Sequence, residues 1–181
     1  ESPKQCHGVY FATHNFCTYG INNGSIKNNV ITNHGGSAWQ LNGDTCVTTG
    51  KIQNLVFENN RAENNAWGVA FWHNAENNTV KDNVIQVNSW PAETNNDKFY
   101  IVRLNNSPGN TFTGNIFYSN NETVWALKTD TVNDDTNSFD NNIWKVSSDI
   151  WYWRDVQRSD WLNYKSVTGW GANSQNCITC N

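Results

Sequence analysis

The sequence predicts an all-β fold: a right-handed single-stranded parallel β-helix of about six coils with Asn ladders at its turns. Three observations predict it. A short phrase recurs along the chain, turn residues bound every copy, and a second group of strands rich in aromatic residues lies between the copies. A repeat of about 20–50 residues is typical of solenoids, in which each repeat packs only against its neighbours.

The recurring phrase is an apolar residue, followed three places later by Asn and then by two apolar residues. Its copies begin at residues 26, 52, 80, 112 and 139, so they are 26, 28, 32 and 27 residues apart. The second copy has Leu55 where the others have Asn. The apolar positions are mostly β-branched or aromatic, which favours strands, and the flanking Asn, Gly, Asp and Ser favour turns. About 26 to 30 residues hold three short strands and three turns, which make one coil.

The Asn of the phrase has a mechanical role in such a coil. Its position recurs directly above itself, so its amide can bond the Asn of the next coil and open backbone groups at the turn. Asn also adopts the left-handed conformation that a tight corner needs. We therefore expect one internal ladder, interrupted at Leu55, and a second set of Asn after each strand. The ladder is Asn29, Asn83, Asn115 and Asn142, and the second set is Asn33, Asn59, Asn88 and Asn120.

The second strand group forms another side of each coil. Its members are residues 8–11, 38–42, 69–73, 100–104, 125–128 and 151–154. We place Leu41, Phe71, Val102 and Leu127 in the core, and strand alternation then turns their neighbours outward. The expected outward column is Asn42, Trp72, Arg103, Lys128 and Arg154.

The three cations of this column indicate a ligand. Stacked like charges repel each other, whereas a bound polyanion makes the arrangement favourable. Aromatic side chains near the column can stack on sugar faces, and the candidates are Tyr10, Trp39, Trp72 and Tyr100. The alternative interpretation is that the cations only discourage edge pairing and keep the rod soluble.

Polar residues near the first strand offer a candidate acid/base pair. Stacking of the first two coils brings His7, Tyr10 and Asp44 towards one rim. A lone His is nevertheless more often a hydrogen-bonded structural residue than a catalyst. The sequence has no nucleophile elbow, phosphate loop or HExxH phrase.

The composition excludes two classes of function. Charged residues make up 15% of the 181 residues and the net charge is −4, so the chain lacks the basic face that nucleic-acid binding requires. It has no run of about 18 apolar residues that would cross a membrane. The length suits a single domain, 1–181, in which we expect residues 155–181 to cap the C-terminal end and the N-terminal coil to be uncapped.

Cysteines and glycosylation sequons favour an extracellular, oxidising compartment. The cysteine spacing does not suit a zinc site, so we expect end-clipping disulfides, with one thiol left free or bonded outside this sequence. The candidates are Cys6, Cys17, Cys46, Cys177 and Cys180. Asn23, Asn77 and Asn121 are candidate N-glycosylation sites, and the sequon at Asn105 is the weakest because Pro108 follows it.

Several segments resemble secreted right-handed parallel β-helix proteins of the pectate-lyase-like superfamily. They are residues 7–10, 28–31, 35–44 and 78–85 and the ending 161–174. The resemblance implies an extracellular polysaccharide partner. Lyases of this superfamily need a base at the sugar C5 and a cation that neutralises the uronate, and Tyr10, His73, Arg103 and Lys128 are the residues that fit these roles. The resemblance also implies calcium as a cofactor, although the sequence shows no compact Asp/Glu cluster and no other metal site.

Two functions follow from these expectations. The first is an extracellular carbohydrate-active protein, lyase-like or glycosidase-like, that binds an acidic polysaccharide along an outer β face. The second is a structural glycoprotein whose copies stack head to tail into an extracellular filament, because an exposed coil end is a row of unpaired strand edges.

Overall fold

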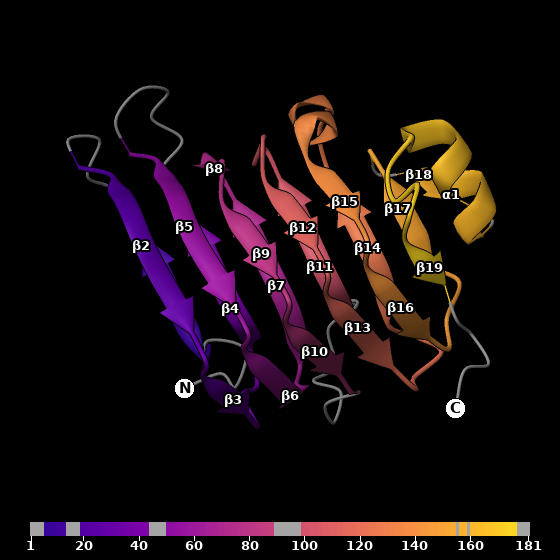
Figure 1. The fold of residues 1–181 in the computed structure, drawn as a ribbon, viewed down its shortest axis with the longest axis horizontal. Coiled ribbons are helices and arrows are strands. Elements are labelled where there is room, and N and C mark those ends of the chain that lie inside the picture. Colours follow the sequence, from indigo (N-terminus) through magenta and orange to yellow (C-terminus); the bar gives the residue numbers. More distant parts are fainter. Residues whose placement is uncertain are drawn as a thin grey trace.

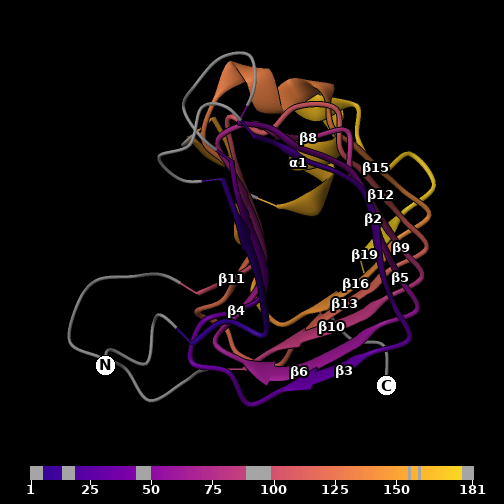
Figure 2. The ribbon, with the colours of Figure 1, turned by 90° about the vertical axis from the view of Figure 1, so that its left-hand side faces the viewer.

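The computed structural model describes residues 6–13, 19–43, 50–88, 99–154, 156–158 and 160–176. As the repeat predicts, the chain forms a parallel β-solenoid of about five turns (Figure 1). Three sheets, which we call A, B and C, surround one interior (Figure 2). The chain visits them in the order A, B, C in each turn, so neighbouring strands of a sheet come from successive coils.

Sheet A contains the aromatic-rich strands of the second group. Six strands pair in parallel, and the seventh, β18, turns back against β17. They are β1 (Val9–Ala12), β4 (Ser37–Asn42), β7 (Trp67–Trp72), β11 (Tyr100–Asn105), β14 (Trp125–Thr129), β17 (Trp151–Trp153) and β18 (Val156–Arg158).

The recurring phrase spans the corner between sheets B and C. Sheet B consists of β2 (Ile21–Lys27), β5 (Ile52–Glu58), β9 (Thr79–Lys81), β12 (Thr111–Thr113) and β15 (Ser138–Asp140), with the short β8 (Ala75–Glu76) beside β5. Sheet C consists of β3 (Val30–Thr32), β6 (Arg61–Asn65), β10 (Val84–Val87), β13 (Ile116–Ser119), β16 (Ile143–Val146) and β19 (Gln175–Asn176).

The solenoid has fewer turns than the six expected because its last turn is incomplete. After β17 the chain forms the β18 hairpin and then the helix α1 (Trp161–Thr168) instead of another strand of sheet B. Asp160 caps the start of α1 by accepting the Asn163 N–H at 2.7 Å, and Gly169 ends it in the left-handed conformation. A short 3₁₀ helix, η2 (Val132–Thr136), lies between β14 and β15.

The inward side chains form one continuous apolar core. Leu41, Phe71, Val102 and Leu127 all belong to it, which confirms the predicted inward positions. Aromatic rings from successive coils contact one another along the interior, with centroid distances of 5.8 Å for Phe71–Phe112 and 4.4 Å for Phe112–Phe139. Stacked large rings bury much apolar area per coil, so each coil is stabilised mainly by its two neighbours.

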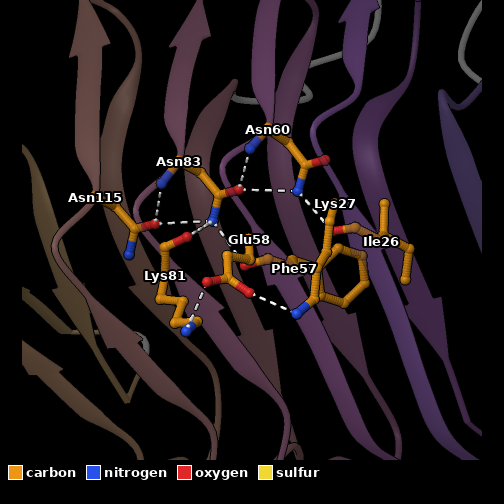
Figure 3. Close-up of polar contacts among 8 residues, drawn as sticks. All are labelled: Ile26, Lys27, Phe57, Glu58, Asn60, Lys81, Asn83 and Asn115. Atoms are coloured by element: carbon orange, nitrogen blue, oxygen red, sulfur yellow. Dashed lines mark hydrogen bonds and ion pairs between the residues drawn. The ribbon is translucent and has the colours of Figure 1, made fainter.

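An internal Asn ladder is present, and it is continuous where the sequence predicted an interruption. Its rungs are Asn29, Asn60, Asn83, Asn115 and Asn142. Each of the first four donates its backbone N–H to the Oδ1 of the next, and Asn142 donates to Ser174 Oγ. The rung that fills the second coil is Asn60, not Leu55 (Figure 3). Leu55 occupies another corner, where its N–H donates to Asn78. The true second copy of the phrase therefore starts at Phe57, which pairs with Ile26 and Val80.

Left-handed corners precede the ladder. The residue before each rung has a positive φ in every coil, in a set formed by Asn28, Asn59, Asp82, Gly114 and Asn141. Asn and Gly tolerate this conformation best, which explains the composition of the phrase. The expected second set also needs one correction: Asn59 belongs to these corners, and Asn64 instead bonds Asn88, at 2.6 Å.

The two ends of the solenoid differ. At the C-terminal end, Trp161 and Tyr164 of α1 pack on Trp151 of β17 with centroid distances of 4.7 and 5.2 Å. At the N-terminal end, Val9 and Phe11 of β1 are only partly buried, although their partners one coil later have no exposed surface. No helix in the described part of the chain is long and apolar enough to cross a membrane.

Candidate binding face on sheet A

The outer face of sheet A carries three columns of side chains. Strand pairing defines each column, because paired residues lie side by side in successive coils. We name them from the start of the strands to their end. The aromatic column is Ser37, Trp67, Tyr100 and Trp125; the central column is Tyr10, Gln40, Ala70, Arg103, Lys128 and Tyr152; and the rim column is Ala12, Asn42, Trp72, Asn105 and, after β14, Asp130.

A kink near the start of several strands brings the aromatic column onto the same face as the central one. Two successive residues belong to the core in several strands, for example Ile101 and Val102 in β11. The residues on either side of this pair, Tyr100 and Arg103, therefore share the outer face although they are three places apart. In β7 the first of the two inward positions is Gly68, where a Cβ would lie 2.2 Å from the Ile101 carbonyl oxygen.

A compact charged cluster occupies adjacent coils of this face. Arg103 and Lys128 are direct cross-strand partners, as the predicted column requires. Asp130 lies against both: its Oδ2 accepts from Arg103 Nε at 3.0 Å, and its Oδ1 is 2.8 Å from Lys128 Nζ. The side chains of Arg103, Lys128 and Asp130 are only 29%, 15% and 9% exposed, respectively. We call these residues the Arg103–Asp130–Lys128 cluster; its formal charge is +1.

The neighbours of the cluster hold Arg103 in place. Its guanidinium lies 5.4 Å from the Trp72 ring centroid and 5.6 Å from that of Tyr100, which are cation–π distances. Burial lowers the pKa of Arg103, but the attraction of Asp130 and Tyr100 outweighs it and raises the pKa overall. Burial raises the pKa of Tyr100 to about 12, so this phenol is neutral at physiological pH and is not a base in this state.

The aromatic side chains of this face stack on one another along the solenoid axis. The Trp67 and Tyr100 rings are stacked and nearly parallel, with an interplanar angle of 6° and a centroid distance of 5.6 Å. Trp125 and Tyr152 stack at 4.1 Å. Their faces are therefore largely occupied by each other, whereas Tyr10 is 48% exposed.

The residues of the predicted column face outward as expected, but not all of them are cross-strand neighbours. Arg103 and Lys128 adjoin, but Trp72 pairs with Asn105 instead of Arg103, and Lys128 pairs with Tyr152 instead of Arg154. The observed pairing differs from the predicted one by two residues at these steps, so each side chain keeps its face but lies in another column.

Two of the predicted sugar-stacking residues are not available for that role. Trp39 points inward, has no exposed surface and contacts Phe57 at 5.5 Å between ring centroids. It is the second residue of the inward pair in β4, where alternation from Leu41 also places it, so it cannot stack on a sugar at the outer face. Tyr100 does face outward, but it is 4% exposed and lies against Trp67. Asn42 and Trp72 are outward neighbours and half-buried.

The predicted catalytic residues fall into separate groups. His7 stacks on Tyr10 with a centroid distance of 5.2 Å, and its Nδ1 accepts the buried Ser37 N–H at 3.0 Å. Burial, followed by repulsion from His34, lowers the pKa of His7. Tyr10 is three coils away from Arg103 in the central column, about 14 Å at the usual strand spacing. The two groups therefore do not act on one sugar bond.

The remaining candidates of this set lie elsewhere. His73 follows β7 with a positive φ and donates its backbone N–H to the Asn105 carbonyl at 2.9 Å. Arg154 follows β17, pairs with Asp135 and lies 4.5 Å from the Trp153 ring centroid. Asp44 lies outside the described residues.

The sites expected for an extracellular protein are described in part. Cys6 is exposed with a free thiol, and the other disulfide candidates, Cys17, Cys46, Cys177 and Cys180, lie outside the described residues. Of the sequon residues, Asn23 and Asn77 are exposed. Asn121 is half-buried, and its Oδ1 accepts both the N–H and the hydroxyl of Thr123 at 2.8 Å.

The described side chains do not fit a metal centre. Within the ranges that the structure covers, no three His, Cys, Asp or Glu residues gather in a group that would hold a metal ion. Hard cations such as calcium take six to eight oxygen ligands. The calcium that the family resemblance implies therefore has no matching donor set among the described residues.

Sequence reasoning missed Asp130 on this face, and it also missed the aromatic Trp67 and Trp125. Asp130 comes two places after Lys128, so the alternation that turns Lys128 outward turns Asp130 outward as well. Its backbone N–H donates to the Leu104 carbonyl at 3.0 Å, which continues the pairing of β14 by one residue. Just beyond it, the buried Asp134 accepts the Thr131 and Ser107 N–H groups at 2.9 and 2.8 Å and thereby holds η2 against the preceding coil.

Comparisons of the chain with family models, with curated proteins and with solved structures find no match. The function is therefore argued from the residues of this face and their geometry.

Proposed function

We propose that this protein is an extracellular carbohydrate-active β-helix protein of the pectate-lyase-like superfamily that binds an acidic polysaccharide along the outer face of sheet A. The single observation that supports it most is the concentration of aromatic and cationic side chains on this one face. Arg103, Lys128, Trp72 and Trp125 lie on adjacent coils there. Acidic carbohydrate ligands present hydroxyl and carboxylate groups that the two cations can bind, and the aromatic rings that contact these cations hold them in place.

The other two faces carry less of this combination, and sheet C has one such pair of neighbours, Tyr118 and Lys145. Paired outward residues of sheet B include Thr79, Thr111 and Ser138, and the cations Lys27 and Lys81 are both paired with Glu58 (Figure 3). Paired outward residues of sheet C include Val84, Ile116 and Ile143. The asymmetry favours sheet A as the face that meets a ligand.

Of the two groups that elimination needs, a base and a cation, the cluster supplies the cation, and it supplies neither of the two free carboxyl groups that hydrolysis needs. A glycosidase needs two carboxyl groups that flank the bond, whereas the three described columns carry one carboxylate, Asp130, which is bound to two cations. Elimination needs positive charge at the uronate carboxylate, which Arg103 and Lys128 supply.

Incubation with a panel of uronate polymers tests the proposal. We expect binding to polyuronates in affinity electrophoresis, and any turnover should produce unsaturated sugars that absorb near 235 nm instead of ordinary reducing ends alone. A neutral glucan of the same length serves as the control polymer. The proposal is wrong if the protein neither binds nor cleaves any member of the panel.

The geometry favours this function over the head-to-tail filament. Such a filament needs an open coil at both ends, so that the strand edges of one copy pair with those of the next. At the C-terminal end, α1 packs its aromatic side chains on the last coil, where a following copy would stack. A stable monomer in sedimentation analysis at high concentration is therefore expected.

A further inference from the structure

The Arg103–Asp130–Lys128 cluster contains an internal carboxylate at the place where an external one is expected to bind. Asp130 lies within 3.0 Å of both cations and is itself only 9% exposed. Its position is fixed from the backbone, because its N–H belongs to the β14–β11 pairing and η2 follows directly. Asp130 is therefore a permanent part of the face.

Asp130 changes the charge that a ligand meets. Arg103 and Lys128 alone would present +2, and Asp130 reduces this to +1. Coulomb energy is proportional to the product of the two charges. The loss of one unit of positive charge therefore weakens the attraction for a doubly charged ligand group twice as much as the attraction for a singly charged one. Low exposure limits screening by salt and water, which makes the difference larger than at an open surface.

We propose that Asp130 sets the charge selectivity of the binding face: it reduces the advantage that sulfated uronates of higher charge density have over polysaccharides with one carboxylate per sugar, such as unmodified polyuronates. This inference rests on the proposed function, since it names the ligand class of the same face. It also explains why the two cations lie side by side: the carboxylate between them offsets their repulsion in the free protein.

The test compares the wild type with Asp130→Asn and with Asp140→Asn as a matched control. Asn has nearly the same shape as Asp, so Asp130→Asn removes the charge and keeps the packing. Asp140 lies on sheet B and accepts from Asn173 N and Nδ2 at 3.0 Å, so Asp140→Asn makes the same change of net charge away from the face. Each protein is titrated with a polyuronate and with a sulfated uronate polymer of equal length, and its fold is checked by circular dichroism.

We expect Asp130→Asn to bind the polyuronate about fivefold more tightly and the sulfated polymer about 25-fold more tightly. The gain in binding free energy doubles when the ligand group carries two charges instead of one. Asp140→Asn should change both affinities by less than about twofold. Equal gains for the two polymers, or no gain, would overturn the role of Asp130 while leaving the binding function intact. A wild type that binds no polyuronate would instead contradict the proposed function.

Discussion

Single buried amides hold adjacent coils together. Asn83 is 1% exposed; its Nδ2 donates to the Phe57 carbonyl of the preceding coil at 2.9 Å and to Asn115 Oδ1 of the following coil at 3.0 Å. Its own Oδ1 accepts two donors from Asn60, at 2.9 and 3.0 Å (Figure 3). One side chain therefore satisfies polar groups of three coils, which a buried corner requires.

Replacement of Asn83 by Leu should be strongly destabilising. The buried donors of Asn60 and the Phe57 carbonyl would lose their partners, and each orphaned group costs about 1–3 kcal/mol, so we expect a loss of about 3 kcal/mol or more in the free energy of unfolding. Urea denaturation measures it. The matched control is Asn120→Ala, at an exposed Asn, which should stay within about 0.5 kcal/mol of the wild type. Similar midpoints for both variants would contradict the ladder.

His7 makes the first coil sensitive to pH. Its neutral Nδ1 accepts the buried Ser37 N–H, so protonation there removes this hydrogen bond and adds repulsion from His34. Burial and His34 lower its folded pKa below the unfolded value of 6.5, so the neutral form is favoured by folding. The stability it contributes is therefore complete above pH 6.5 and is lost as the pH falls from there through the folded pKa.

NMR titration of the His7 ring checks this prediction. We expect a midpoint below 6.5 in the folded protein, together with a urea midpoint that falls more between pH 7.5 and pH 5.5 in the wild type than in His7→Gln. A folded midpoint at or above 6.5 would contradict the account of this residue.

At the scale of elements, α1 is stabilised by its contacts with the last coil. Trp161 is 8% exposed and lies against Trp151, whereas the next residue, Leu162, is 75% exposed on the other side of the helix. A short isolated helix of eight residues has little stability of its own. Its docking therefore depends on the buried aromatic side chains.

Truncation of Trp161 should expose the end of the core. We expect Trp161→Ala to lower the free energy of unfolding by about 3–5 kcal/mol and Leu162→Ala to change it by less than about 0.5 kcal/mol. Thermal and urea unfolding of the two variants give the comparison. An equal effect at the two neighbouring positions would show that α1 does not stabilise the last coil.

The strand assignment was predictable from the sequence, but the pairing between coils was not. The phrase located the corner between sheets B and C in four coils and failed in the second, where Ile52 to Phe57 also matches it. The true copy there, 57–62, has Arg61 at an outward position where the others have an apolar residue, and this hides it. Alternation fixes which face a side chain occupies, but not which residue of the next coil lies beside it.

The candidate face was also predictable only in part. Its direction and the adjacency of Arg103 and Lys128 were predicted, because both depend on local alternation. Tyr100 faces outward because two successive residues point inward near the start of its strand, and the sequence pattern does not mark this kink. Trp39 lies inward, as alternation from Leu41 implies, so its choice as a sugar-stacking residue did not follow from the pattern. Asp130 was missed although its spacing from Lys128 was visible.

At the scale of the whole molecule, the proposal is that sheet A, among three outer faces of similar length, binds an acidic polysaccharide. Sheet B offers a matched comparison, because Lys27 and Lys81 are two cations on either side of Glu58, much as Arg103 and Lys128 adjoin Asp130. Net charge alone therefore does not distinguish the faces. The aromatic neighbours of Arg103 do.

The most direct test is the affinity for a polyuronate of two double variants with the same net charge, Arg103→Gln/Lys128→Gln on sheet A and Lys27→Gln/Lys81→Gln on sheet B. We predict that the first variant loses at least about tenfold in affinity, because charge-assisted hydrogen bonds to the ligand are removed, and that the second stays within about twofold of the wild type. Equal losses in the two variants, or none in the first, would contradict the claim that sheet A is the binding face.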